Sequence, residues 1–323
     1  MLKNQNKLIE NITRHIISSL YENVGGIRYK NRGDSFYTQE KNIVDELSNY
    51  DLSGKVIYCN CDNPTMSNFY KFFRKNFNVL GLKLLYATYF GENPKLYIFN
   101  GSQEKSFPIQ SGRFQDNARI MQRCDIVITN PPFSDGMPKE LVNMARQMGK
   151  HIIMVGPLSM AYQNEMFELI KNGQLNMGYT TINNYNRPNG SNKKKSNAPT
   201  AWWTTMETNK PMFRTGSKYI ESQFPTYDNY PNIIHISDYR KMPDDYNGLM
   251  GLSPRFLRML NRNQFEIVGK IRPVLNGKNM MEQYVIRRKS QQQQLSQVAE
   301  SITNDVIMRI DESRKNCNFF QFA

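Results

Sequence analysis

Short runs of consecutive apolar residues alternate with amphipathic segments between residues 55 and 155 of the 323-residue chain. The runs have no polar face, which is typical of strands in a parallel sheet that helices cover on both sides. The segments between the runs repeat apolar residues at helical spacing and predict crossover helices. The pattern therefore predicts an α/β fold with a doubly wound, mostly parallel sheet. The expected strands are residues 55–59, 82–89, 125–129, 150–155, 180–184 and 201–206, and the expected helices are residues 67–78, 139–148 and 166–171.

Helical spacing also marks both ends of the chain. Residues 8–20 carry an apolar residue at every fourth position, and residues 295–310 do so at every third or fourth position. Ile43, Val44 and Leu47 predict a further helix before the first strand. From about residue 207 the sequence is rich in Pro, Tyr, Asn and Arg and shows no clear βα units. We therefore expect four parts, covering residues 1–32, 33–206, 207–290 and 291–323.

A polar turn, Asn130-Pro131-Pro132-Phe133, follows the apolar run 126–129. It lies at the carboxyl end of the expected strand, and ligands of open α/β sheets bind outside these ends. The prolines restrict the backbone and have no N–H, so the corner is stiff and rich in acceptors. The side-chain carbonyl of Asn130 and the backbone carbonyl of Pro131 can each accept one N–H of an exocyclic amine. Phe133 can stack on a base, a contact worth roughly 1–3 kcal/mol per base.

This arrangement suits methylation of a planar amine, because two accepted hydrogen bonds localise the nitrogen lone pair and aim it at an electrophilic methyl. The competing interpretation is an ordinary turn, since Asn-Pro commonly starts one. The position of the turn after a fully apolar strand favours the chemical interpretation.

Charge and composition point to a polyanionic partner. The chain has 42 Lys and Arg against 28 Asp and Glu, a formal charge of +14, and 12% aromatic residues, a combination that suits nucleic acid. Four cysteines occur, and Cys59-Asn60-Cys61 lacks the spacing of a zinc site, so we expect reduced thiols and no metal. No apolar run is long enough for a membrane span and the amino terminus has no signal-like core. We expect a cytoplasmic protein without membrane contact.

Two basic segments are candidates for phosphate contacts. Residues 254–290 carry nine basic residues against Glu266 and Glu282, and a second cluster lies in a loop broken by prolines and Gly190. A solvated charged face is the competing interpretation. The expected nucleic-acid contacts are Lys193, Lys194, Lys195, Arg255, Arg258, Arg287 and Arg288.

Several stretches, spread in order over roughly residues 33–290, match one known family. They are residues 34–39, 56–64 with 67–69, 81–83, 124–134, and 224–230 with 245–251. On these motifs the chain resembles the adenine-specific DNA modification methylases of the EcoRI type.

The resemblance implies a Rossmann-like methyltransferase fold with S-adenosylmethionine as methyl donor. It also implies an adenine flipped out of a specific sequence in double-stranded DNA as substrate. Residues 33–206 would then be the catalytic domain and 207–290 the target-recognition region. No obligate protein partner is expected.

The resemblance further implies which residues bind the methyl donor. Phe36, Tyr37 and Thr38 match the segment that closes over its methionine end, where an aromatic face would meet the sulfonium. Cys59, Asn60, Cys61 and Asp62 match the loop that lines it.

Two departures from the family pattern concern its acids. The family's Gly-Asp-Phe is Gly112-Arg113-Phe114 here, so we expect Asp116 to replace the missing acid. The second strand also ends without a carboxylate for the ribose, and Glu92 is the nearest.

Other functions remain open from the residues alone. RNA adenine methylation and methylation of a protein glutamine amide would also present a planar amine to the turn. A catalytically silent DNA-binding relative is the third alternative. The basic carboxyl-terminal region favours nucleic acid over protein.

Overall fold

The computed structural model describes residues 37–89, 93–133, 136–182, 185–186, 192–193 and 199–290. The chain divides into two compact units, residues 1–208 and 209–323. The helices predicted over residues 8–20 and 295–310 lie outside the described residues, as do Phe36, Glu92, Lys194 and Lys195. No helix in the described part of the chain is long and apolar enough to cross a membrane.

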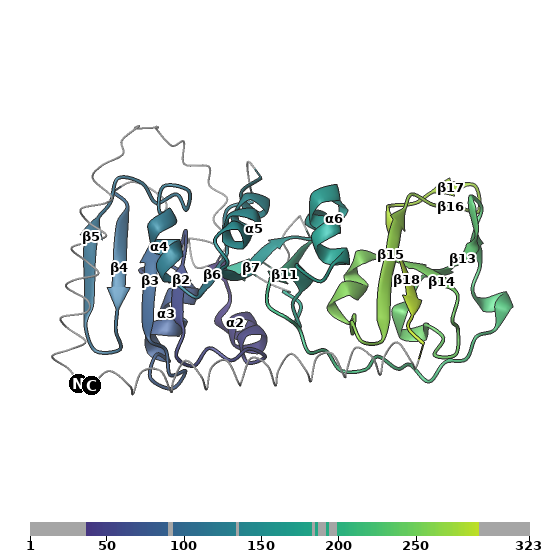
Figure 1. Ribbon diagram of the computed structural model, residues 1–323, viewed down its shortest axis with the longest axis horizontal. Helices are drawn as coiled ribbons and strands as arrows, with labels where there is room; N and C mark the ends of the chain where they lie inside the picture. The colour runs from purple at the N-terminus through teal and green to yellow at the C-terminus, as the bar shows by residue number, and fades with distance from the viewer. Residues whose placement is uncertain are drawn as a thin grey trace, which may run out of the picture. The chain divides into compact units, whose positions relative to one another are not determined.

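The first unit is built on an eight-stranded sheet (Figure 1). Six strands run in one direction, while β4 and β11 run antiparallel to their neighbours. The central strands are fully buried, as their continuous apolar runs predict. In spatial order the strands are β5 (Glu104–Pro108), β4 (Lys95–Phe99), β3 (Leu84–Thr88), β2 (Val56–Cys59), β6 (Ile126–Thr129), β7 (His151–Pro157), β11 (Thr200–Thr204) and β8 (Asn176–Met177).

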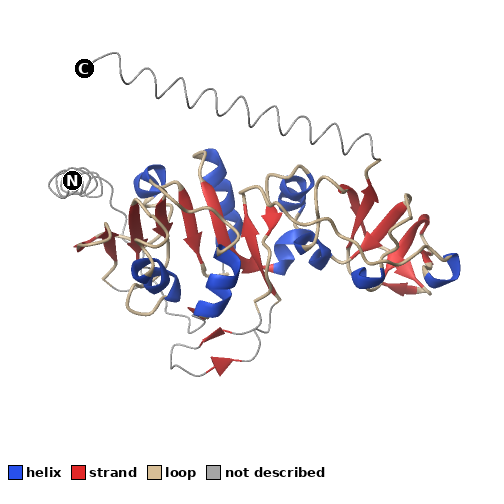
Figure 2. Cartoon of the chain, turned by 90° about the horizontal axis from the view of Figure 1, so that it is seen from below, coloured by secondary structure: helices blue, strands red, loops and turns tan. Residues whose placement is uncertain are grey.

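Helices lie on both faces of this sheet (Figure 2). In α3, Phe69, Phe72 and Phe73 are buried on one side, and the Ser67 hydroxyl caps the helix by accepting from the Phe69 N–H at 3.1 Å. The predicted doubly wound α/β fold is confirmed. The helices are α2 (Glu40–Leu47), α3 (Asn68–Lys75), α4 (Ala118–Arg123), α5 (Met137–Gln147), α6 (Asn164–Lys171) and the 3₁₀ turn η2 (Leu158–Tyr162).

The chain reverses direction across the sheet at β2. From β2 it continues to β3, β4 and β5 on one side, and then returns to β6 on the other side of β2. The carboxyl ends of β2 and β6 therefore flank a topological switch point, where open α/β sheets bind their ligands.

One predicted strand is wrong over its described part. Residues 180–182 form no strand, and the edge strand is β8 at 176–177 instead. The reason is Glu46 on α2, whose buried carboxylate accepts the backbone N–H groups of Tyr179 and Thr180 at 2.7–3.1 Å. Amides held in this way cannot join a strand ladder.

A small second sheet joins distant parts of the first unit through the backbone. Its strands β1 (Tyr37–Thr38), β9 (Tyr185–Asn186) and β10 (Asn192–Lys193) pair antiparallel in the order β1-β9-β10. The segment before α2 thus pairs with the loop that carries Lys193.

The second unit has a mostly antiparallel five-stranded sheet and no α-helix among its described residues. Ser253 and Pro254 begin a helical turn as predicted, although it is the short 3₁₀ helix η5 (Pro254–Arg258). The sheet order is β12 (Thr226–Tyr227), β13 (Tyr230–Ile236), β14 (Leu249–Leu252), β18 (Gln283–Arg288) and β15 (Phe265–Ile271), beside the hairpin of β16 (Val274–Leu275) and β17 (Lys278–Asn279) and the 3₁₀ turns η3 (Glu221–Gln223) and η4 (Tyr239–Lys241).

Candidate functional site

The loop after β2 and the turn after β6 meet at the switch point. Ile57 and Tyr58 pair in register with Ile126 and Val127, so the two strands end side by side. The Thr129 hydroxyl donates to the backbone carbonyl of Asn60 and ties the two carboxyl ends together. Two segments about 70 residues apart in the sequence thereby form one polar edge.

The predicted catalytic turn follows β6 directly. Asn130 and Pro132 are half-buried and Pro131 is buried. Phe133 is 37% exposed although it is a large apolar side chain. An aromatic face left accessible beside a stiff acceptor corner is the geometry that base stacking requires.

Asp62 is the buried acid of this edge. Its Oδ1 accepts from the Ser67 hydroxyl at 2.6 Å, and its Oδ2 has no hydrogen-bond partner among the described residues. Burial raises the pKa of Asp62 to about 7, and the hydrogen bond from Ser67 only partly offsets this effect. A buried oxygen without a partner is costly, so it indicates a ligand group that completes the site.

Thr38 supplies a second such group. Its side chain is 2% exposed, and Oγ1 lacks a hydrogen-bond partner in the described part of the chain. Its backbone carbonyl accepts from Asn68 Nδ2 at 2.8 Å, which ties the segment to α3 immediately after the Ser67 that holds Asp62. Thr38 and Asp62 thus gather at the start of α3. These two buried polar atoms fit a polar ligand such as the methionine end of S-adenosylmethionine.

The remaining residues of the predicted cofactor loop differ in exposure, and Cys61 is half-buried. Cys59 and Asn60 are buried, and Cys61 adopts φ 61°, the left-handed conformation expected of a tight turn. The Cys61 thiol donates to Asn60 Oδ1 at 2.6 Å. Burial raises the pKa of both thiols, so neither is a reactive thiolate. Tyr37 lies in β1, and its side chain is outside the described residues.

The segment before α4 places Asp116 unexpectedly. Asp116 is exposed, whereas the next residue, Asn117, is 1% exposed and donates through Nδ2 to the carbonyls of Ser111 and Arg113. An exposed carboxylate is a poor candidate for a cofactor's adenine. The structure therefore disfavours Asp116 in that role and draws attention to Asn117, which the sequence interpretation did not consider.

Other contributors were also missed from sequence. Ser67 had a visible signal, because a serine before an aromatic helix face is a typical N-cap. No sequence signal pointed to Thr129, because its hydrogen bond to Asn60 depends on β2 and β6 being neighbours.

Comparison with known proteins indicates one family. The model of the adenine-specific methyltransferase EcoRI family matches residues 28–117 and 103–312. The Type II methyltransferase M.EcoRI of Escherichia coli is 31% identical over 300 residues, covering 78% of this chain and 90% of that protein. The chain belongs to the EcoRI family of adenine-specific methyltransferases.

A second relative leads to the same family. The Type II methyltransferase M.MpnI of Mycoplasma pneumoniae is 30% identical over 267 residues, covering 74% of this chain and 83% of that protein. This methyltransferase family confirms the predicted enzyme class, an adenine-specific DNA methyltransferase. Among solved structures, a proposed RNA methyltransferase from Pyrococcus horikoshii matches 60% of this chain and 98% of its own with 12% identity. Its TM-score of 0.32 is too low to support an argument.

The basic residues predicted to contact DNA in this methyltransferase differ in exposure and in the ion pairs that they form within the protein. Arg288 is 8% exposed, pairs with Asp244 at 3.1 Å and lies 4.7 Å from the centre of the Phe265 ring. Arg287 pairs with Glu266 at 2.7 Å. Such contacts indicate that Arg288 stabilises its own unit, so the structure disfavours it as a phosphate ligand.

Two arginines of η5 are better placed for phosphate. Arg255 is exposed, and Arg258 is half-buried with an N–H 3.5 Å from the Tyr239 hydroxyl. Lys193 contributes its backbone to β10, and its side chain lies outside the described residues.

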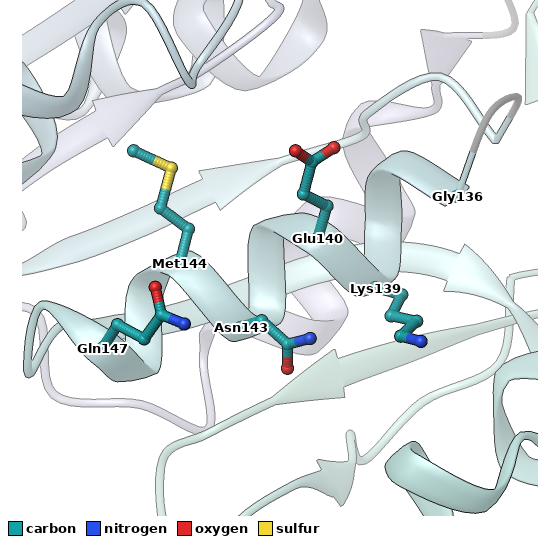
Figure 3. Close-up of a pocket in the computed structure, with 6 residues that line it drawn as sticks. All are labelled: Gly136, Lys139, Glu140, Asn143, Met144 and Gln147. Carbon is teal, nitrogen blue, oxygen red and sulfur yellow. The ribbon is translucent and has the colours of Figure 1, made fainter.

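A hollow of about 440 Å³ lies along α5, the helix that follows the predicted catalytic turn (Figure 3). Its lining comes from this one helix and the glycine before it, with no residue from β2, β3 or β6. It is therefore separate from the candidate site. The lining residues are Gly136, Lys139, Glu140, Asn143, Met144 and Gln147.

Proposed function

We propose that this family member transfers the methyl group of S-adenosylmethionine to the N6 amine of an adenine flipped out of double-stranded DNA. The observation that carries the proposal is the Asn130–Phe133 turn, which ends β6 at the switch point next to a buried, incompletely bonded Asp62. A substrate amine and a methyl donor would meet at this edge of the sheet.

The turn would act on the amine by orientation and not by removing a proton first. Asn130 Oδ1 and the Pro131 carbonyl accept its two N–H groups and localise the lone pair, while Phe133 stacks on the base. Preorganised acceptors stabilise charge that develops on the nitrogen during transfer. After the methyl group has been transferred, the nitrogen is cationic and strongly acidic, and its proton passes to water.

The methyl donor would lie against the start of α3. S-adenosylmethionine supplies an electrophilic methyl on a sulfonium. We assign its ammonium to Asp62 Oδ2 and its carboxylate to Thr38 Oγ1, because each is a buried group that can form one more hydrogen bond. Tyr37 and Phe36 would face the sulfonium, and Cys59, Asn60 and Cys61 would form the wall beside it.

Residues 207–290 would read the target sequence, with residues 33–206 as the catalytic domain. Arg255, Arg258, Arg287 and the loop lysines Lys193, Lys194 and Lys195 are the proposed phosphate contacts. Phosphate contacts of this kind release counterions and make binding dependent on salt. Membership of an adenine-specific family argues against protein glutamine as substrate.

The experiment is methylation of several substrates by the purified chain, with the methyl donor carrying a labelled methyl group. Duplex DNA of high sequence complexity, single-stranded DNA, RNA and a glutamine peptide are offered separately, and nucleosides are identified by mass spectrometry. We expect N6-methyladenine from duplex DNA and none from the same reaction with Asn130→Ala. Label in RNA or peptide but not in duplex DNA would overturn the proposal.

A further inference from the structure

The segment between β5 and α4 lies at the same edge of the sheet as the site. β3 is antiparallel to β4, and β4 is antiparallel to β5, so β5 ends where β2, β3 and β6 end. Residues 109–117 leave that edge and lead into α4, which contacts β2. The segment therefore runs from the outer strand of the sheet toward the loop proposed to line the methyl donor.

Asn117 holds this segment in one conformation. Its Nδ2 donates to the carbonyls of Ser111 at 2.8 Å and Arg113 at 2.6 Å, and the residue is 1% exposed. The amide cannot be turned over, because its oxygen would then face two other carbonyl oxygens. Oδ1 is consequently fixed in direction, and it is a buried atom with no hydrogen-bond partner among the described residues.

Gln115 presents a second acceptor two residues away. Its Oε1 is also a buried atom that finds no partner within the described part of the chain. Buried acceptors are rarely left unsatisfied, so two in one short segment point to a ligand with two donors. An exocyclic amine on an aromatic ring offers two N–H donors in one plane.

We propose that Asn117 Oδ1 and Gln115 Oε1 accept the N6 amine of the methyl donor's adenine and so select adenine over oxo purines. This inference rests on the proposed function, and it assigns a subsite left open by Gly112-Arg113-Phe114, where the family has an acid. The segment approaches β2 from the β3 and β5 side, whereas the target turn follows β6 on the other side. The cofactor's adenine is therefore the occupant, and not the flipped base.

The two carbonyls are neutral, and this distinguishes them from the family's carboxylate. They read the amine through hydrogen bonds alone, without attraction from a charge. Selection for adenine should then be insensitive to pH across the range in which a carboxylate titrates.

The test is calorimetric binding of two ligands without DNA, so that only the cofactor site is sampled. One ligand is S-adenosylhomocysteine, and the other is its inosine analogue, in which a carbonyl oxygen replaces the amine. The wild-type protein should prefer the adenine ligand by roughly 10- to 100-fold, the range for one or two well-made hydrogen bonds. Gln115→Ala and Asn117→Ala should each move that ratio toward one.

The ratio of the two affinities reports selection for adenine, because a general loosening of the fold would weaken the binding of both ligands alike and leave the ratio unchanged. Gln115→Ala is the decisive variant if Asn117→Ala fails to fold, because no described contact of the segment depends on the Gln115 side chain. Gln110→Ala, exposed in the same segment, should keep the wild-type ratio.

Three outcomes would overturn the inference. A wild-type ratio in the folded Gln115 and Asn117 variants would remove both residues from the adenine subsite while leaving the proposed function intact. A ratio lost equally in Gln110→Ala would show that the assignment to these two residues is wrong. Failure of the wild-type protein to bind S-adenosylhomocysteine at all would overturn the proposed function and this inference with it.

Discussion

The edge of the first sheet and the second unit both bury polar side chains, but they treat them differently. At the edge, Thr38, Asp62 and Asn117 each keep a buried atom without a hydrogen-bond partner among the described residues. In the second unit, Lys210 is 6% exposed and donates to the Leu257 carbonyl at 2.9 Å. Lys270 is likewise shielded and pairs with Glu282 at 3.0 Å. Buried polar atoms without partners lower the free energy of unfolding, whereas buried polar groups with partners avoid that cost.

This difference separates groups that await a ligand from groups that maintain the fold. Buried polar atoms are normally satisfied, so a cluster of exceptions at a strand edge indicates function. Basic residues that already have partners indicate structure, whatever the net charge of the chain suggests. Arg288 contributes to the count of basic residues, but its Nη2 bonds to Asp244 and to the Pro243 carbonyl, and Nε is its one buried atom without a hydrogen-bond partner among the described residues.

The largest effect is expected at Asn130, where the comparison predicts loss of catalysis without loss of stability. Asn130→Ala should lower the single-turnover methylation rate by roughly 100- to 1000-fold, the cost of removing one preorganised hydrogen-bonding group from a transition state. Affinity for the methyl donor and for DNA should change little. Rapid-quench kinetics and binding titrations measure the two quantities.

Asn143→Ala is the matched control, because Asn143 lies on α5 outside the site and bonds to Glu165. It should retain the wild-type rate. A single-turnover rate within a few-fold of wild type for Asn130→Ala would remove that residue from the mechanism.

Glu46 in the first unit tests whether buried polar groups that have hydrogen-bond partners stabilise the fold. It accepts from Tyr50 Oη at 2.8 Å, from the Tyr179 and Thr180 amides and from the Thr180 hydroxyl. Glu46→Ala should lower the free energy of unfolding by about 2–4 kcal/mol, since several buried donors lose their acceptor. Denaturant unfolding of the ligand-free protein measures this.

The control for Glu46 is Glu165→Ala. Glu165 is an exposed partner of Lys139, and such surface pairs are worth less than about 1 kcal/mol. Equal losses in the two variants would show that burial and pairing at Glu46 do not stabilise the unit.

The apolar pattern predicted the central strands and their helices because burial on both faces leaves a continuous signal in the sequence. It missed the β4–β5 hairpin, where only alternate residues of β5 are partly buried and none is fully buried. The apolar pattern also predicted a strand at residues 180–184. Nothing in the local sequence shows that the carboxylate of Glu46, over 130 residues away, accepts the Thr180 backbone N–H. Long-range side-chain contacts of this kind override local propensity.

The site was predictable where it follows strand ends and unpredictable where it depends on burial. Asn130 was predicted because it follows an apolar run, whereas Asp62 was predicted only through the family resemblance. Asp116 and Asn117 are adjacent polar residues of similar size, and the sequence offers no reason to prefer the second. Only the fold shows that one is exposed and the other buried.

The buried carboxyl group of Asp62 makes both stability and ligand affinity depend on pH. Its pKa of about 7 in the folded, ligand-free protein lies above the ordinary value of 3.8, so the folded state holds a proton that the unfolded state has lost. The contribution of Asp62 to the stability of the ligand-free protein is therefore greatest below pH 3.8, and it falls by about 1.4 kcal/mol per pH unit as the pH rises toward 7. A cationic ligand group favours the ionised carboxylate.

Affinity for S-adenosylhomocysteine, which keeps the ammonium, should consequently rise as the pH rises to 7 and level off above it. Asp62→Asn should bind more weakly and show no such rise, whereas Asp116→Asn, at an exposed position, should keep the wild-type profile. Calorimetry between pH 5.5 and about 8 measures it. A wild-type affinity that is flat or falls over that range would contradict the assignment of the ammonium to Asp62.

The smallest effect is expected on DNA affinity when either of two arginines is replaced, although the sequence predicted the same DNA contact for both. Arg255 is exposed, so Arg255→Ala should weaken binding to all duplexes similarly and flatten the plot of log affinity against log salt by about 0.9, the loss of one phosphate contact. Arg288→Ala should leave the slope unchanged and lower the midpoint of denaturant unfolding, because the Asp244 pair and the Phe265 contact are lost. Binding titrations at several salt concentrations, with unfolding curves for both variants, separate the two roles. If Arg288→Ala flattens the salt plot and Arg255→Ala does not, paired charges in the second unit do contact DNA, and the distinction between satisfied and waiting groups fails there.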